Sequence, residues 1–478
     1  MVVHRIGLLT KALLLYPAIG RSQPPAFRAG AATSNVTPRL GSSMNGGMTN
    51  VIASHVHDEL HARCLVLDDG GTKLALVVVD SCMLPRDLVL DAKRRIAEQS
   101  GIPADHVMIS ATHSHSTPAS APVFQSGANP EYLPFLAERI ADAVRRAVNN
   151  LAPSQIGWGA GQVPDEVFNR RWRLKPSVQL VDPFGRPDQV RMNPTPGSPD
   201  LVEPAGPVDP ELSILAAVQP NGLPVAALAN YSLHYVGGVG AGHVSADYFG
   251  FFASRLATLL SAEHEDPPFV AMMTNGTSGD VNNIDFRTAR PAAKPYERIA
   301  EVGNTVACEA QRVIEGITYR KAVSLDARAA EISLQVRKPS RDEIGVAEAI
   351  LKKAEGRPLR GMDEIYARET KLLASYPDRV DLTIQAMRIG DLAIVAIPCE
   401  VFTEIGLKLK AESPIRPMFT VELANGYNGY LPTTGQHALG GYETWRARSS
   451  YLEKGAADAI VTKALALLAD LKRSTTRD

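Results

Sequence analysis

The sequence predicts a layered α/β fold in which mixed β-sheets are flanked by helices. The first third of the chain alternates apolar strands with amphipathic helices, which is typical of α/β domains. Several apolar runs end directly in segments rich in His, Asn and Gly, the usual place of a site in this fold class. The hydrophobic content of 45% and the charged content of 21% over 478 residues are ordinary for a globular protein.

The chain shows no boundary that would split it, and we expect one catalytic domain over residues 26–478. Residues 1–25 are read as a separate leader, because a basic start precedes an apolar stretch from Ile6 to Gly20 that Lys11 interrupts. This leader is either a signal peptide, which makes the protein secreted or periplasmic, or a segment that stays attached to a cytoplasmic protein. No other stretch has the roughly 18 apolar residues of a transmembrane segment. We detect no internal repeats.

The net charge and the cysteine spacing argue against some classes of function. A formal net charge of -1 leaves no basic footprint and argues against nucleic acid as a partner. The cysteines match no Cys-x-x-Cys metal or redox pattern. They are either apolar thiols or disulfide-bonded, and we favour thiols: Cys64, Cys82, Cys308 and Cys399.

Taken in order, the apolar patterns predict the following elements. Strands are expected at 57–69, 73–80 and 107–109, and helices at 87–99 and 132–149. A proline-rich stretch, 162–210, is expected to be irregular. Strands at 212–218 and 225–231, a helix from 247 to about 261 and a strand at 269–274 follow, and the segment 275–280 is a candidate amide-rich nest for an oxyanion. Residues 337–376 predict helices that form either a peripheral hairpin or a rim over the site, 384–397 two strands around Gly390, and 453–471 a helix.

The segment from Ile109 to Pro118 contains His113 and His115 after an apolar strand. In an extended backbone these two rings point the same way, because side chains alternate with a period of two. Neutral imidazole is the commonest zinc ligand among side chains. The alternative is two hydrogen-bonded histidines in a polar loop, and so short a motif does not decide between them.

Other expected strand ends carry His234, Glu400 and Tyr430. Imidazoles and a carboxylate converging at one rim are what an open zinc site requires, although sequence separation alone does not bring these residues together. The pair Arg170 and Arg171 is either solvated or in contact with an anion or a carbonyl in a pocket.

The segment from Ser110 to Pro118 resembles the Gly-Thr-His-Thr-His-Ser-Gly-Pro signature of the neutral/alkaline (non-lysosomal) ceramidase family. These are zinc-dependent amidases that cut the N-acyl bond of ceramide. The similarity extends over Ala29–Tyr451 and includes Asn169-Arg170-Arg171, Tyr231-Ser232-Leu233-His234, Asn275–Asn283, Pro398-Cys399-Glu400 and Tyr427–Glu443.

The resemblance implies a role for each matching residue. The metal ligands would be His113, His234, Glu400 and Tyr430, and the catalytic residues His115, Tyr442 and Arg170, with Arg171 as the competing assignment. The expected function is zinc-dependent hydrolysis of an N-acyl bond in a small-molecule or lipid-like amide, by attack of metal-activated water. Sphingolipid metabolism is the expected context.

The sequence departs from the family pattern at several places. Asn282 stands where the family has a Ser once considered catalytic, and Ser278 is nearby but out of register. Thr117 and Cys399 replace family glycines. The chain ends soon after Tyr442, so the carboxyl-terminal immunoglobulin-like domain of typical ceramidases is not expected.

Two other functions remain open at this stage. One keeps the zinc and changes the bond, as in an esterase or lactonase. The other is a catalytically silent homologue that binds a lipid or small ligand.

Overall fold

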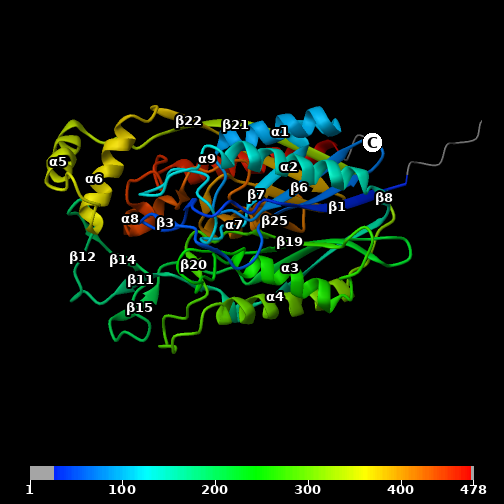
Figure 1. Cartoon of the computed structure of the whole chain (residues 1–478), viewed down its shortest axis with the longest axis horizontal. Coiled ribbons are helices and arrows are strands. Elements are labelled where there is room, and N and C mark those ends of the chain that lie inside the picture. The colour runs from blue at the N-terminus through cyan, green and yellow to red at the C-terminus, as the bar shows by residue number, and fades with distance from the viewer. Residues whose placement is uncertain (1–25, 475–478) are drawn as a thin grey trace, which may run out of the picture.

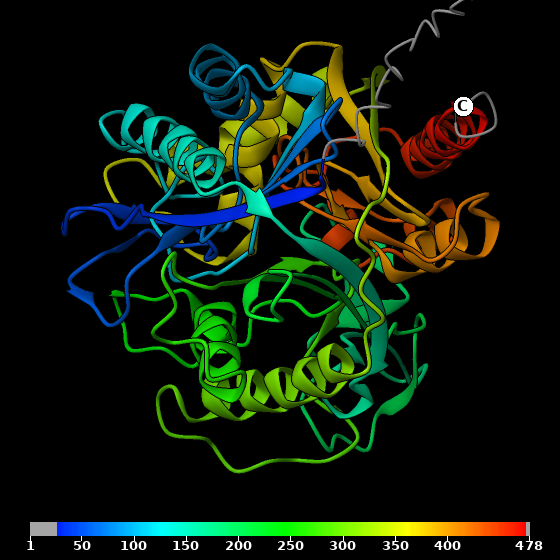
Figure 2. The same cartoon turned by 90° about the vertical axis from the view of Figure 1, so that its right-hand side faces the viewer.

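The computed structural model describes residues 26–474, so the expected leader lies outside the described residues. Within this range three sheets of four or five strands form the body of the molecule (Figures 1 and 2), and helices cover their outer faces. The predicted fold class, layered mixed sheets flanked by helices, is confirmed.

The strands and helices have the following bounds. The first sheet has the order β7 (Val107–Ala111), β6 (Lys73–Val79), β5 (His61–Asp68), β1 (Arg28–Asn35) and β8 (Ala152–Pro153). The second has the order β19 (Val270–Asn275), β17 (Pro224–Tyr231), β16 (Glu211–Val218) and β9 (Gln155–Gln162). The third has the order β21 (Leu325–Gln335), β22 (Arg379–Ile389), β23 (Leu392–Ala396) and β25 (Met418–Val421). The principal helices are α1 (Arg86–Ser100), α2 (Tyr132–Asn149), α3 (Asp247–Leu259), α4 (Glu297–Glu315), α7 (Thr403–Glu412) and α9 (Ala456–Ser474).

The same pairing pattern occurs in all three sheets. Three antiparallel strands are followed by a helix, and a fourth strand then returns parallel to the third. The connecting helices are α1, α3 and α7, and a second helix follows each fourth strand: α2, α4 and α9. We call each set a unit. This threefold repetition lies in the strand pairing and not in similar residues, so it is consistent with the absence of detectable repeats in the sequence.

The three sheets share one core. Their inner faces contribute to a single apolar cluster that includes Leu65, Leu228 and Ile394, all essentially inaccessible to solvent. Fully burying such a side chain contributes about 1.5–3 kcal/mol each. The outer faces pack under α1 and α2, α3 and α4, and α7 and α9, respectively (Figure 2). Each sheet is therefore buried on both faces, as strands with continuous apolar runs require.

Helix α2 illustrates how local sequence sets this packing. Leu136, Ile140, Val144 and Ala147 recur at helical spacing and are buried against the first sheet. The bounds of α2 agree with the predicted range, because this stripe is long and regular. Helix α9 was likewise expected, and it extends three residues past 471.

The proline-rich stretch 162–210 is more ordered than expected. It contains several short strands, of which β11 (Arg171–Leu174) pairs with β14 (Val190–Met192) and β15 (Leu201–Pro204). The prediction of an irregular segment was wrong, because strands this short have no periodicity to detect.

Residues 337–376 contain α5 (Arg341–Lys353) and α6 (Gly361–Ala374), which pack together at one end of the molecule (Figure 1). A capping box at Ser340 begins α5, with Glu343 as its partner.

The structure also bears on the state of the cysteines and on membrane-spanning helices. The four cysteines are free thiols, as favoured. Within residues 26–474, no helix combines the length and the apolar character of a bilayer-spanning segment.

Replacing Gly30 by Ala should destabilise the fold. A Cβ at this position of β1 would lie 2.3 Å from the carbonyl oxygen of Ala147 and 2.7 Å from the backbone nitrogen of Leu151, at the end of α2. Since both are backbone atoms, we expect a loss of about 1–3 kcal/mol and a lower Tm in calorimetry. The control is Gly345→Ala in α5, where no heavy atom lies within 4 Å, and where Ala should stabilise by roughly 0.5–1 kcal/mol. Equal Tm values for the two variants would contradict this packing.

Candidate metal centre and active site

Three strand ends, one from each unit, meet at a buried cluster of metal-ligating side chains. His113 follows β7, His234 follows β17, and Glu400 begins the short strand β24 (Glu400–Val401) after β23. All three are buried, and one ligand atom from each lies within 4.8 Å of the others. The cluster forms here because parallel strand pairs present their carboxyl ends at one edge of a sheet.

The two imidazoles face each other through their Nε2 atoms, which are 3.0 Å apart. Glu400 Oε2 lies 3.3 Å from Nε2 of His113 and 4.0 Å from Nε2 of His234. Tyr430 joins them because β26 (Tyr430–Leu431) pairs in parallel with β24 and places Tyr430 opposite Glu400. The structure thus brings together the four residues predicted as metal ligands.

The other nitrogen of each ring is held by a backbone carbonyl. His113 Nδ1 lies 2.7 Å from the carbonyl oxygen of Cys82, and His234 Nδ1 lies 3.0 Å from that of Ser278. A carbonyl only accepts hydrogen bonds, so each Nδ1 carries a proton and each Nε2 faces the cluster, where a neutral imidazole presents its lone pair. This is the usual orientation of histidines that bind a metal.

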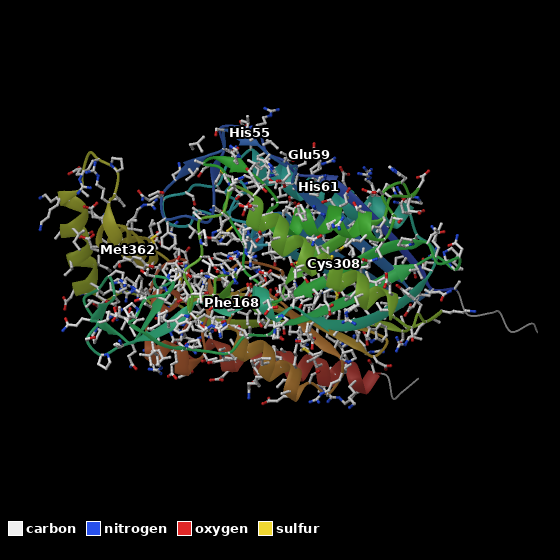
Figure 3. The ribbon with its side chains drawn as sticks, turned by 90° about the horizontal axis from the view of Figure 1, so that it is seen from below. His55, Glu59, His61, Phe168, Cys308 and Met362 are labelled. Atoms are coloured by element: carbon white, nitrogen blue, oxygen red, sulfur yellow. The ribbon has the colours of Figure 1, made fainter. Side chains whose placement is uncertain are left out.

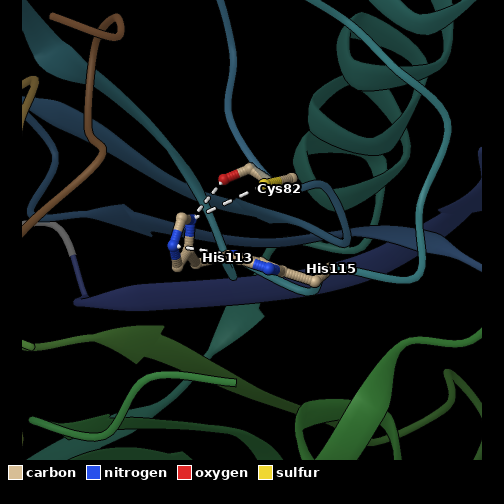
Figure 4. A group of neighbouring side chains, drawn as sticks. All are labelled: Cys82, His113 and His115. Atoms are coloured by element: carbon tan, nitrogen blue, oxygen red, sulfur yellow. Dashed lines mark hydrogen bonds between the residues drawn. The ribbon is translucent and has the colours of Figure 1, made fainter. Parts of the chain in front are cut away.

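Cys82, His113 and His115 form a second group of neighbouring donors that shares His113 (Figure 4). The Cys82 thiol is 3.8 Å from His113 Nδ1. That nitrogen is already bonded to the carbonyl of Cys82, so the geometry favours the group with His234 and Glu400.

The sequence predicts an extended backbone at His113, but the structure shows a different conformation. Its φ of 72° lies in the left-handed region, which is uncommon for a residue with a Cβ. His113 and His115 nevertheless lie beside each other, with their Nε2 atoms 3.2 Å apart. Such strained backbone is found where surrounding structure holds a functional side chain in place.

The cluster accommodates one positive charge between its donors. Burial favours a neutral imidazole, but the Glu400 carboxylate and Cys82 together outweigh it and raise the pKa of His113 well above its ordinary value. Burial, followed by the Arg170 guanidinium, holds the pKa of His234 well below its ordinary value. Burial opposes ionisation of Glu400, yet His113 and Arg170 lower the pKa of this carboxyl overall. These opposing shifts favour one cationic group among these donors, the place that a bound metal ion would take.

Glu400 also shows how a metal would fit. Its Oε1 accepts a hydrogen bond from the Tyr427 hydroxyl at 3.0 Å, whereas its buried Oε2 has no hydrogen-bond donor among residues 26–474. An orphaned buried carboxylate oxygen is costly. A divalent cation between this oxygen and the two Nε2 atoms would satisfy all three.

Arg170 and Arg171 point in different directions. Arg170 donates to the Tyr430 hydroxyl at 3.1 Å and to the carbonyl of Gly279 at 2.8 Å. Arg171 is fully buried and donates to the carbonyl of Gly440 at 2.7 Å. The Glu443 carboxylate bridges the two guanidiniums, at 3.0 Å from Arg170 and 2.5 Å from Arg171. Only Arg170 of the pair therefore touches a residue of the cluster.

Aromatic rings lie beside the ligand cluster. Tyr442 lies with its ring centroid 5.8 Å from that of Tyr430. Tyr235 stacks on His115, with ring centroids 3.7 Å apart and planes inclined by 18°. These contacts fix the positions of two predicted catalytic residues, His115 and Tyr442, next to the ligand cluster.

Sequence reasoning missed Tyr235, Tyr427 and Glu443. Tyr235 directly follows His234, and Glu443 directly follows Tyr442. Their position next to predicted site residues was the available signal that they also belong to the site. Nothing in the local sequence distinguishes Tyr427 from other tyrosines.

The predicted oxyanion nest at 275–280 was wrong. The backbone N–H groups of Gly276, Thr277, Ser278 and Gly279 donate to Tyr231, Ser232, Glu422 and Val401, so these four are not available to a ligand. Asn282 donates to the side chain of Asn193 at 2.8 Å.

Comparisons with known proteins identify the family to which the chain is related. The family model described as "Neutral/alkaline non-lysosomal ceramidase, N-terminal" matches residues 27–290. A neutral ceramidase of Pseudomonas aeruginosa is 22% identical over 91% of this chain and 71% of its own length. Neutral ceramidase A of Dictyostelium discoideum is 22% identical over 64% of this chain and 44% of its own length.

Solved structures show the same fold. The crystal structure of neutral ceramidase from Pseudomonas aeruginosa superposes with a TM-score of 0.71 at 19% identity, covering 94% of this chain and 75% of that one. A structure titled "Ceramidase complexed with C2" gives a TM-score of 0.71 at 17% identity, over 94% of this chain and 76% of that one. Since the family model alone covers more than half of the sequence, the chain belongs to the neutral/alkaline non-lysosomal ceramidase family, whose members hydrolyse amide bonds.

Proposed function

We propose that the chain is a zinc-dependent amidohydrolase that cleaves the N-acyl bond of a small-molecule or lipid-like amide. The observation that carries the proposal is the buried cluster in which two imidazole lone pairs and an orphaned carboxylate oxygen face one another. The names of its relatives, neutral ceramidases in two organisms, support an amide as the substrate.

His113, His234, Glu400 and Tyr430 would hold the ion. Two imidazoles and a carboxylate with a position left open are typical of catalytic zinc. Bound there, zinc supplies a Lewis acid for a carbonyl and lowers the pKa of a bound water towards neutrality.

His115 is placed to move protons. Burial, followed by the neighbouring His113 and Arg170, holds the pKa of His115 well below its ordinary value. Its imidazole is therefore neutral at pH 7 and can accept a proton from the attacking water and return it to the leaving amine. Stacking on Tyr235 keeps the ring in position.

Arg170 and Tyr442 are the candidate donors to the oxyanion that forms when the carbonyl is attacked. A guanidinium stays charged, and burial with the nearby Glu400 raises the pKa of Tyr442, so its hydroxyl keeps its proton. A preorganised donor of this kind is commonly worth about 3 kcal/mol in the transition state.

The shared core of the three units supports a single catalytic domain over residues 26–478, because each unit supplies part of the site. In this proposal α5 and α6 form a peripheral hairpin.

The direct test is hydrolysis of a matched pair of substrates, an N-acyl amino alcohol and the corresponding ester, with acyl release measured by mass spectrometry. The wild-type protein should release the acyl chain from the amide. The variant His115→Ala should lose about 10²–10⁴-fold in kcat and keep its metal, because His115 is not assigned as a ligand.

The control is His264→Ala, which changes an exposed histidine and should keep full activity. Hydrolysis of the ester alone would overturn the amidase proposal in favour of an esterase or lactonase. No hydrolysis of either substrate would point to a ligand-binding homologue.

Replacing Glu443 by Gln should damage both stability and catalysis. Glu443 is the only carboxylate within ion-pair distance of Arg170 or Arg171 among residues 26–474. Its loss leaves two buried guanidiniums unpaired, which typically costs about 3–5 kcal/mol. We expect a lower Tm in calorimetry and a reduced kcat/KM, because Arg170 loses the contact that orients it.

The matched control is Glu348→Gln, which removes an exposed partner of Lys371 and should change stability by less than about 1 kcal/mol. A Glu443→Gln variant as stable as this control would contradict the pairing described above.

A further inference from the structure

Two surface histidines far apart in the sequence lie directly opposite each other. The two-residue strands β4 (His55–Val56) and β18 (His243–Val244) pair in parallel, with His55 opposite His243. Their ring centroids are 4.5 Å apart. His55 is exposed and His243 is partly exposed, so both rings are accessible to an ion from solution. Neither residue belongs to the candidate active site.

The hydrogen bonds of this pair leave ligand atoms free. His243 Nδ1 is 2.5 Å from the Tyr296 hydroxyl, and its Nε2 has no hydrogen-bond partner among residues 26–474. The His55 ring has no side-chain hydrogen bond within the same range. Tyr296 is in turn stacked on His57, with ring centroids 3.6 Å apart. The His243 ring is therefore held from one side and presents a lone pair or proton at Nε2 on the other.

Two imidazoles whose ring centroids lie 4.5 Å apart on paired strands supply two donors for a transition metal. Imidazole suits zinc, copper and nickel, and the strand pairing has already removed much of the freedom that binding would cost. The backbone is firmly joined here, because Ser54 donates to Gly242 at 2.8 Å and His57 donates to Val244 at 3.0 Å.

The two strands belong to segments that both reach His115. In the first segment, the backbone of Gly46 lies against the His115 ring, since a Cβ there would be 2.4 Å from its Cγ. In the second segment, Tyr235 stacks on the same His115 ring. The pairing of β4 with β18 is thus one of the contacts that join two segments positioning one candidate catalytic residue.

We propose that His55 and His243 bind a second divalent transition-metal ion, such as zinc, which fastens these two segments together beside His115. Water completes the coordination of the ion. The ion restricts the movement of the two segments that contact His115 and so lowers kcat/KM. This regulatory consequence rests on the proposed function, whereas binding of the ion does not.

The test is isothermal titration of zinc chloride into the protein as purified, with its own metal in place. The wild type should bind one additional ion with a dissociation constant in the micromolar range. His55→Ala and His243→Ala should each weaken this event by about tenfold or more. The control His264→Ala, which removes an exposed histidine elsewhere, should bind like the wild type. Equal Tm values without added zinc would show that both variants are folded.

The same variants test the consequence for the reaction. Excess zinc should lower kcat/KM of the wild type and of His264→Ala and leave His55→Ala and His243→Ala unaffected. Zinc binding that is unchanged in both variants would overturn the second site. Inhibition that persists in both would overturn its link to His115. If the protein hydrolyses no amide, the titration still decides on the metal site, so the two proposals fail separately.

Discussion

The site depends on hydrogen bonds that fix the two histidine rings. Each Nδ1 donates to a carbonyl that follows the neighbouring parallel strand: Cys82 after β6 for His113, and Ser278 after β19 for His234. Each ring is therefore oriented by a carbonyl that follows the neighbouring strand. The two Nε2 atoms face each other at a distance of 3.0 Å. Buried polar atoms so arranged are costly unless a cation lies between them.

The threefold pairing pattern explains how residues separated by almost 300 positions meet. Every unit ends in one parallel strand pair, and these pairs surround the shared core that the inner faces of the sheets build. The first unit supplies His113, the second His234 and the third Glu400. None of the units holds two of these three ligands, so the site exists only when all three sheets pack together. Figure 3 shows the side chains of the described residues on the ribbon.

Some of this was predictable from sequence and some was not. Long periodic elements such as α2, and the strands that precede His113 and His234, have patterns that burial dictates locally. The threefold pairing depends on contacts between distant strands and leaves no local trace. The nest at 275–280 was predicted wrongly because sequence does not show which backbone N–H groups are already used. Tyr427 and Glu443 act through distant partners, Glu400 and Arg170, and their roles follow only from the fold.

The central claim is that one zinc ion lies between the three units. Anomalous diffraction at the zinc edge, from crystals grown without added metal, tests it most directly. The account predicts one strong peak within bonding distance of His113, His234 and Glu400, with Tyr430 beside it. A crystal with no anomalous peak among these residues, or with its peak between Cys82 and His115 instead, would contradict the account.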